Sequence, residues 1–193
     1  MHKYLTILTL VLGAGTAQAD DFQSELQNYF DRQITDWSTS QIIVDAINAQ
    51  NAETATYDQA KIDEMDQLWR GFAGMADAEI ITNVTQTPAA TFLRDRIAIS
   101  NGVITEAFIM DARGLNVAAA SPTSDYWQGD EAKFTQTYPL GAGAVHFGEV
   151  EIDDSTQAVQ AQISTAITDP ATGQTIGALT VGVSLTDLQS ASN

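Results

Sequence analysis

The stretch QAVQAQISTAITDPATGQTIGALTVGVSL, residues 157–185, decides the fold. It contains two runs rich in β-branched and small apolar residues, Gln157–Ile167 and Thr175–Leu185, on either side of the sequence DPATG at 169–173. Short runs of this kind, bounded by Asp, Pro and Gly, are typical of strands that a hairpin turn joins. The stretch therefore predicts two long antiparallel strands.

Three further runs upstream have the same character. They are Val103–Met110, Leu115–Ala120 and Ala144–Glu149, and the sequence DARG at 111–114 has the composition of a tight turn between the first two. Because strands joined by hairpins pair with one another, the second half of the chain predicts an antiparallel sheet of about five strands.

The first half of the chain, before Gly102, has a helical rather than a strand period. Apolar residues recur at three- and four-residue intervals over 22–49, with an interruption at 38–40, which predicts two helices or one bent helix. A second helical pattern covers 57–72, and a third follows Pro88, a residue suited to a first helical turn. We therefore expect an α+β fold, with N-terminal helices packed on a curved antiparallel sheet.

The first nineteen residues have the features of an export signal. A short positive end is followed by the apolar run Tyr4–Leu12 and by Ala17-Gln18-Ala19, a pattern that a signal peptidase recognises. The apolar run is far shorter than the roughly 20 residues that a membrane-spanning helix needs. We expect removal of residues 1–19, a periplasmic or secreted protein without direct membrane insertion, one domain made of a helical part (20–102) and a sheet part (103–188), and a tail at 189–193.

Composition excludes several classes of function. After removal of the leader, seven Lys or Arg face 25 Asp or Glu, and a field of this sign repels nucleic acid. The chain has no cysteine, and a lone His146 after the leader makes a poor metal site. No phosphate loop, nucleophile elbow or zinc-protease motif is present, so we expect no cofactor, no metal and no catalytic activity.

Several segments, taken in order, resemble a known family. The sequence DARG at 111–114, VAAAS at 117–121 and TSDYWQGDE at 123–131, together with the closing hairpin up to 183, are similar to the Cache (extracellular PAS-like) sensor domains. Ala166 stands where that family often has proline. The resemblance implies a long N-terminal helix, a curved sheet and a small-molecule pocket between the sheet and the loops that cross it. Most members of that family are outer domains of membrane receptors, but the expected leader and the lack of a second apolar span make this chain similar to a free-standing single Cache domain.

The loop 124–131 is the strongest candidate site on its residues alone. Tyr126 and Trp127 offer aromatic faces to an organic cation, and Asp125 and Asp130 could accept hydrogen bonds from an amine. The alternative is structural: Trp127 packs under the loop and Asp125 caps a turn.

Two basic residues add a possible contact to a ligand carboxylate. Arg94 and Lys133 are the candidates, and pairing with one of the many acids is the alternative for both. The resemblance adds Ser121, within the shared motif, and Asp154, at the pocket rim.

The expected function is the binding of a small polar metabolite, an amino acid or organic cation, by a sensor domain. Such a domain would present its bound state to a membrane receptor, kinase or transporter. The alternatives are an interaction module with a vestigial pocket and a ligand carrier or scavenger.

Overall fold

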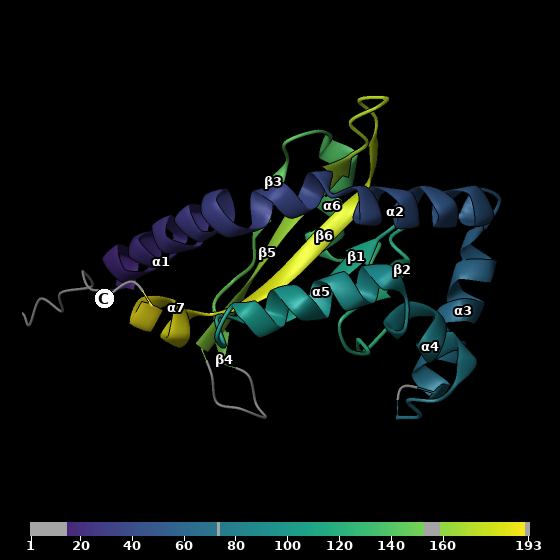
Figure 1. Cartoon of the computed structure of the whole chain (residues 1–193), viewed down its shortest axis with the longest axis horizontal. Helices are drawn as coiled ribbons and strands as arrows, with labels where there is room; N and C mark the ends of the chain where they lie inside the picture. Colours follow the sequence, from purple (N-terminus) through teal and green to yellow (C-terminus); the bar gives the residue numbers. More distant parts are fainter. Residues whose placement is uncertain (1–14, 73, 153–158, 192–193) are drawn as a thin grey trace, which may run out of the picture.

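The computed structural model describes residues 15–72, 74–152 and 159–191 (Figure 1). Its helices are α1 (Gly15–Tyr29), the π-helical turn η1 (Phe30–Ile34), the 3-10 turn η2 (Thr35–Thr39), α2 (Gln41–Thr54), α3 (Gln59–Phe72), α4 (Glu79–Thr85), α5 (Pro88–Ile99), α6 (Ala132–Thr135), η3 (Tyr138–Leu140) and α7 (Leu185–Ala191). Its strands are β1 (Ile104–Met110), β2 (Asn116–Ala119), β3 (Val145–Phe147), β4 (Glu151–Ile152), β5 (Val159–Thr168) and β6 (Thr175–Ser184). Most of the expected leader lies outside these ranges, and among the described helices none is long and apolar enough to cross a membrane.

The strands form one antiparallel sheet in the order β2-β1-β6-β5-β3, with β4 paired to β5. The α+β prediction is therefore confirmed, and the five predicted strands are β1, β2, β3, β5 and β6. The sixth, β4, has only two residues, which is too short to give an alternating pattern in the sequence. The pair β5 and β6 is the hairpin of residues 157–185, and β6, at the centre of the sheet, is buried along nearly its whole length.

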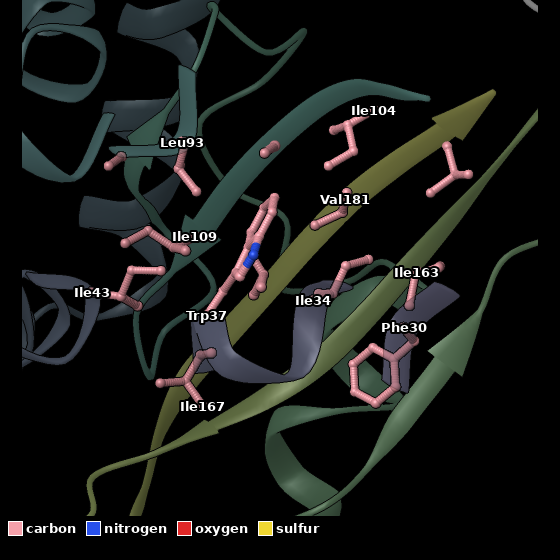
Figure 2. Packing of buried hydrophobic residues seen from close by; sticks show 14 of the residues in the cluster. Phe30, Ile34, Trp37, Ile43, Leu93, Ile104, Ile109, Ile163, Ile167 and Val181 are labelled. Atoms are coloured by element: carbon pink, nitrogen blue, oxygen red, sulfur yellow. The ribbon is translucent and has the colours of Figure 1, made fainter. Parts of the chain in front are cut away.

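One face of the sheet carries the long N-terminal helices. Figure 1 shows α1 and α2 lying end to end, with α5 across the sheet beside them. The helices from α1 to α2 form a rod, which bends where Ser40 leaves the helical conformation, with ψ of 125°. This bend is the interruption predicted at 38–40. Trp37, at this bend, packs among Ile109, Ile167 and Val181 in the main core (Figure 2). Burial of this apolar face, rather than helix propensity, holds the bent rod in place.

Helix α2 also holds both predicted hairpin turns. The side chain of Asn51 donates to the carbonyl of Ile176 (2.7 Å) and accepts from the backbone N–H of Ala112 (2.8 Å). Gly114 and Gly173 close the two turns with φ of +79° and +71°, a conformation that glycine adopts without strain. Polar contacts from one helix therefore fix the ends of both hairpins.

The second hairpin turn gives the fold a pH-dependent contribution. The backbone N–H of Ala171 and the amide of Asn48 donate to Asp169, and these bonds hold the pKa of its carboxyl below the usual 3.8. The pKa of Asp169 is lower in the folded than in the unfolded chain, so the ionised carboxyl stabilises the fold. This contribution is fully present above the unfolded pKa and is lost as pH falls through the folded pKa.

We expect Asp169→Asn to lower the melting temperature at about pH 7 and to have a smaller effect at about pH 3. Thermal unfolding at the two pH values measures the difference. Asp63→Asn, an exposed carboxyl on α3, is the control. If the melting temperatures of the wild type and Asp169→Asn differ by the same amount at both pH values, the ionised carboxyl of Asp169 does not stabilise the fold.

Candidate functional site

The second face of the sheet is polar at its centre. Alternation along the strands places Phe108, Thr180 and Ser164 in one row on this face, since they are cross-strand partners. The Ser164 and Thr180 hydroxyls hydrogen-bond each other at 3.0 Å. In the next row the amide of Gln162 donates to Glu106 at 2.6 Å, across Gly182. A buried sheet face with paired hydroxyl and carboxylate groups differs from the apolar face under the helices.

The connection between β2 and β3 covers this polar face. Its helix α6 contacts β5, and its turn η3 contacts β5 and β6. The rings of Phe134 and Tyr138 stack at 5.2 Å, and the Nζ atom of Lys133 lies 5.5 Å from the centre of the Phe108 ring. A loop that crosses an open sheet face in this way is the element that the sequence resemblance implied.

A cavity of about 200 Å³ lies at the edge of this cover, and we call it the sheet-face cavity. It is lined by Glu131, Lys133, Gly148, Glu149, Glu151, Gln160, Ala161 and Gln162. The Lys133 side chain is 15% exposed, and its Nζ atom lies 2.9 Å from a Glu131 oxygen and 3.1 Å from Oε1 of Gln128. The cavity thus offers one fixed ammonium group and several carboxylates, which suits a ligand with both charges.

Helix α3 fixes the predicted aromatic loop from the other side. A single carboxylate oxygen of Asp66 accepts from the backbone N–H groups of Tyr126 (2.9 Å) and Trp127 (3.1 Å). The indole of Trp69 stacks on Tyr126 at 5.5 Å and donates to the carbonyl of Thr123 at 2.9 Å. These contacts explain why a stretch rich in Gly, Ser and Asp has one conformation.

The structure separates the four residues predicted in this loop. Asp125 pairs with Arg70 at 3.4 Å and accepts from the amide of Gln128. Trp127 donates its indole N–H to the carbonyl of Arg113 at 2.9 Å, while Asp130 is exposed. None of the four lines the sheet-face cavity, and Tyr126 lines a different one, between α2, α3 and α4. Their roles in ligand binding stay predictions.

The other predicted residues also lie apart. Arg94 donates to the carbonyl of Thr85, the last residue of α4, and to the hydroxyl of Thr91. Ser121 is exposed just after the end of β2, and Asp154 lies outside the described residues. Of the predicted set, Lys133 is the residue that the structure places in the sheet-face cavity.

Sequence reasoning did not select Gln128, a partner of Lys133, or the paired side chains of Glu106 and Gln162 on the sheet face. Gln128 lies inside the loop 124–131, fully buried, and Glu106 and Gln162 occupy outward positions of predicted strands. Polar residues that alternate with apolar ones along β1 and β5 are the signal that could have identified this face. Within the described ranges no group of three or more Asp, Glu or His side chains is arranged to hold a metal ion.

Comparison with known proteins finds no matching family profile and no matching curated protein. Among solved structures, the chain is similar to the sensor domain of the V. cholerae histidine kinase DctB, at 14% identity and a TM-score of 0.49, over 91% of this chain and 57% of that one. The ligand-binding domain of the Pseudomonas aeruginosa amino-acid chemoreceptor PctC, in complex with GABA, gives 14% identity and a TM-score of 0.46 over 92% of this chain and 61% of that one. The corresponding domain of Campylobacter jejuni Tlp3, in complex with L-valine, gives 12% and 0.42 over 93% and 67%.

The helical rod on one face of an antiparallel sheet is the α+β arrangement that the sequence resemblance to Cache domains implied. The chain spans less than two thirds of the DctB and PctC domains.

Proposed function

We propose that this protein is an exported Cache-type sensor domain that binds a small zwitterionic metabolite, such as an amino acid, in the sheet-face cavity. It presents the bound state to a membrane receptor, kinase or transporter and has no catalytic chemistry of its own. The position of Lys133 carries the proposal. Its ammonium group is held over Phe108 at the cavity wall, where it can meet a ligand carboxylate.

The surrounding acids fit the other half of such a ligand. Glu131, Glu149 and Glu151 line the same cavity, and Glu131 already pairs with Lys133. An arriving carboxylate takes the place of Glu131 at the ammonium, and the released Glu131 becomes available to the ligand amine. Binding thus replaces the pair of Lys133 and Glu131 by two pairs, Lys133 with the ligand carboxylate and Glu131 with the ligand amine. Each charge keeps a partner, as a partly buried cavity requires.

A chain of polar contacts connects the cavity to α3. Lys133 contacts the side-chain oxygen of Gln128, whose amide donates to Asp125, and Asp125 pairs with Arg70 on α3. Because Gln128 is fully buried, a shift of Lys133 toward a ligand changes a contact that Gln128 has no solvent to replace. This series of contacts supports the proposal that ligand binding alters the position of α3, where a partner protein can detect the change.

Ligand screening by thermal shift, followed by calorimetry, tests the proposal. L-Valine and GABA, present in two of the similar domains, come first in the screen. A ligand at about a hundred times its dissociation constant raises the free energy of unfolding by about 2.7 kcal/mol. If no amino acid stabilises the fold, the proposed function is wrong, and the alternative of an interaction module with a vestigial pocket takes its place.

We expect Lys133→Met to lower the affinity for an amino acid by about 10- to 100-fold, since a charge-assisted hydrogen bond contributes about 1.5–3 kcal/mol. Methionine retains most of the apolar stem over Phe108, but the buried oxygen of Gln128 loses its donor, so the melting temperature should fall while unfolding stays cooperative. Lys61→Met, which breaks an exposed ion pair with Glu64 on α3, is the matched control and should bind as the wild type does. Equal affinity of the Lys133 and Lys61 variants would exclude the sheet-face cavity as the site.

A further inference from the structure

A second cavity lies on the other side of the aromatic loop, between α2, α3 and α4. Its volume is about 270 Å³, and we call it the three-helix cavity. Its polar lining residues are Gln50, Glu53, Thr54, Tyr57, Asn83 and Tyr126. It shares no lining residue with the sheet-face cavity, so the two can be tested independently.

The hydroxyl of Tyr126 has no intramolecular partner here. Tyr126 is 8% exposed and stacks on Trp69, and its hydroxyl forms no hydrogen bond with any residue in the described part of the chain. Burial raises the pKa of this hydroxyl, with smaller contributions from nearby Asp111, Tyr57 and Glu53, so the group stays protonated. The hydroxyl is not enclosed by protein atoms, and it opens onto the three-helix cavity, where a ligand can replace water as its partner.

The charge of the cavity restricts what that partner can be. Glu53 lies at the exposed mouth of the cavity and no described residue pairs with its carboxylate, while Asp111 also lies close enough to Tyr126 to affect its pKa. No basic side chain is among the described lining residues, and nearby Arg113 is bound to the carbonyl of Ala55 at the end of α2. An anion would meet repulsion and no counter-charge, whereas a cation would be attracted.

The remaining walls suit an organic rather than a metal cation. Tyr57 and Tyr126 contribute aromatic rings, and Met65, Ile80 and Val84 contribute apolar surface. A metal ion would need several carboxylate or carbonyl oxygens, but aromatic and apolar walls with one free carboxylate favour an alkylammonium group. The sequence had associated Tyr126 with an organic cation, and the structure replaces Asp125 and Asp130 with Glu53 as its acidic partner.

We propose that the three-helix cavity is a second ligand site, which binds a small organic ammonium compound between Glu53 and Tyr126. The ammonium group lies against the Glu53 carboxylate and the tyrosine rings, and a hydroxyl or amine of the ligand bonds the Tyr126 hydroxyl. The site acts independently of the sheet-face cavity.

Calorimetric titration with choline, n-butylammonium and the neutral choline isostere 3,3-dimethyl-1-butanol tests this proposal. We expect at least one of the two cations to bind and the neutral alcohol to bind at least tenfold more weakly. Glu53→Gln should lower the cation affinity about tenfold, and Tyr126→Phe should lower the affinity for choline, which carries a hydroxyl, more than that for n-butylammonium. Failure of both cations at millimolar concentration, or equal binding of the alcohol, would overturn it.

Two control variants distinguish binding in the three-helix cavity from binding elsewhere on the protein. Glu64→Gln makes the same chemical change on the exposed surface of α3 and should leave cation binding within twofold of the wild type. Glu131→Gln should also leave it unchanged, because Glu131 lines the other cavity. Loss of cation binding in the Glu131 variant would place the cation in the sheet-face cavity and refute a second site.

Discussion

Replacing Asp111 by alanine is expected to lower the free energy of unfolding by about 3–5 kcal/mol, since two backbone N–H groups lose their acceptor and two side chains of α2 lose one of theirs. The Asp111 side chain is fully buried. One oxygen accepts from the backbone N–H groups of Arg113 (2.8 Å) and Leu115 (3.0 Å), and the other accepts from Gln50 (3.1 Å) and Thr54 (2.8 Å) on α2. The residue therefore closes the first hairpin turn and attaches it to the helix. Urea unfolding followed by circular dichroism measures the loss.

A second substitution distinguishes the acceptor role of Asp111 from its shape. Asp111→Asn keeps the volume but turns one acceptor into a donor that faces other donors, so most of the loss should remain. Asp36→Ala, on the exposed 3-10 turn η2, is the control. Thr39 bonds the backbone carbonyl of Asp36 and not its carboxylate, so this change should leave the free energy of unfolding nearly unaltered. A loss below about 1 kcal/mol for Asp111→Ala would show that water replaces the four contacts.

The same turn shows why the sheet could be predicted from sequence. The turn DARG and the turn DPATG each combine an Asp that binds its own backbone with a Gly at positive φ, and the strands on either side are long enough to show their period. The helices α4 and α6 were missed because seven and four residues are too few to repeat a helical period clearly, and β4 has only two residues. Their positions depend on tertiary contacts.

The site was less predictable, for a physical reason. The residues of the loop 124–131 were expected to act together. The loop lies between α3 and the sheet, however, so its side chains point in different directions. Tyr126 points toward α3 and the three-helix cavity, whereas Gln128 and Lys133 point toward the sheet face. Composition can identify such a stretch as chemically rich. It cannot assign its members to one cavity or another, because the partners Asp66, Trp69 and Phe108 are far away in sequence.

Trp69 is the partner on which the conformation of this loop depends most. Its side chain is fully buried in the smaller core, against Ile81 and Tyr126, and its indole donates to Thr123 at the start of the loop. Truncation of a buried tryptophan leaves a large cavity and here also an unpaired carbonyl. We therefore expect Trp69→Ala to lower the free energy of unfolding by about 3–5 kcal/mol.

Trp127→Ala is the matched comparison, since Trp127 is partly exposed and packs mainly on Gly129 and the first hairpin turn. It should cost less than half as much as Trp69→Ala. Trp69→Phe retains the stacked ring and loses the indole N–H, so its cost should approach that of one hydrogen bond, about 1 kcal/mol, beyond the smaller ring. Denaturant unfolding of the three variants ranks them, and a larger loss for Trp127→Ala than for Trp69→Ala would show that the loop is anchored by the hairpin turn instead of by α3. The rank matters for the proposed function, because the contacts from Lys133 through Gln128 and Asp125 reach Arg70 on α3 only while the loop is anchored on that helix.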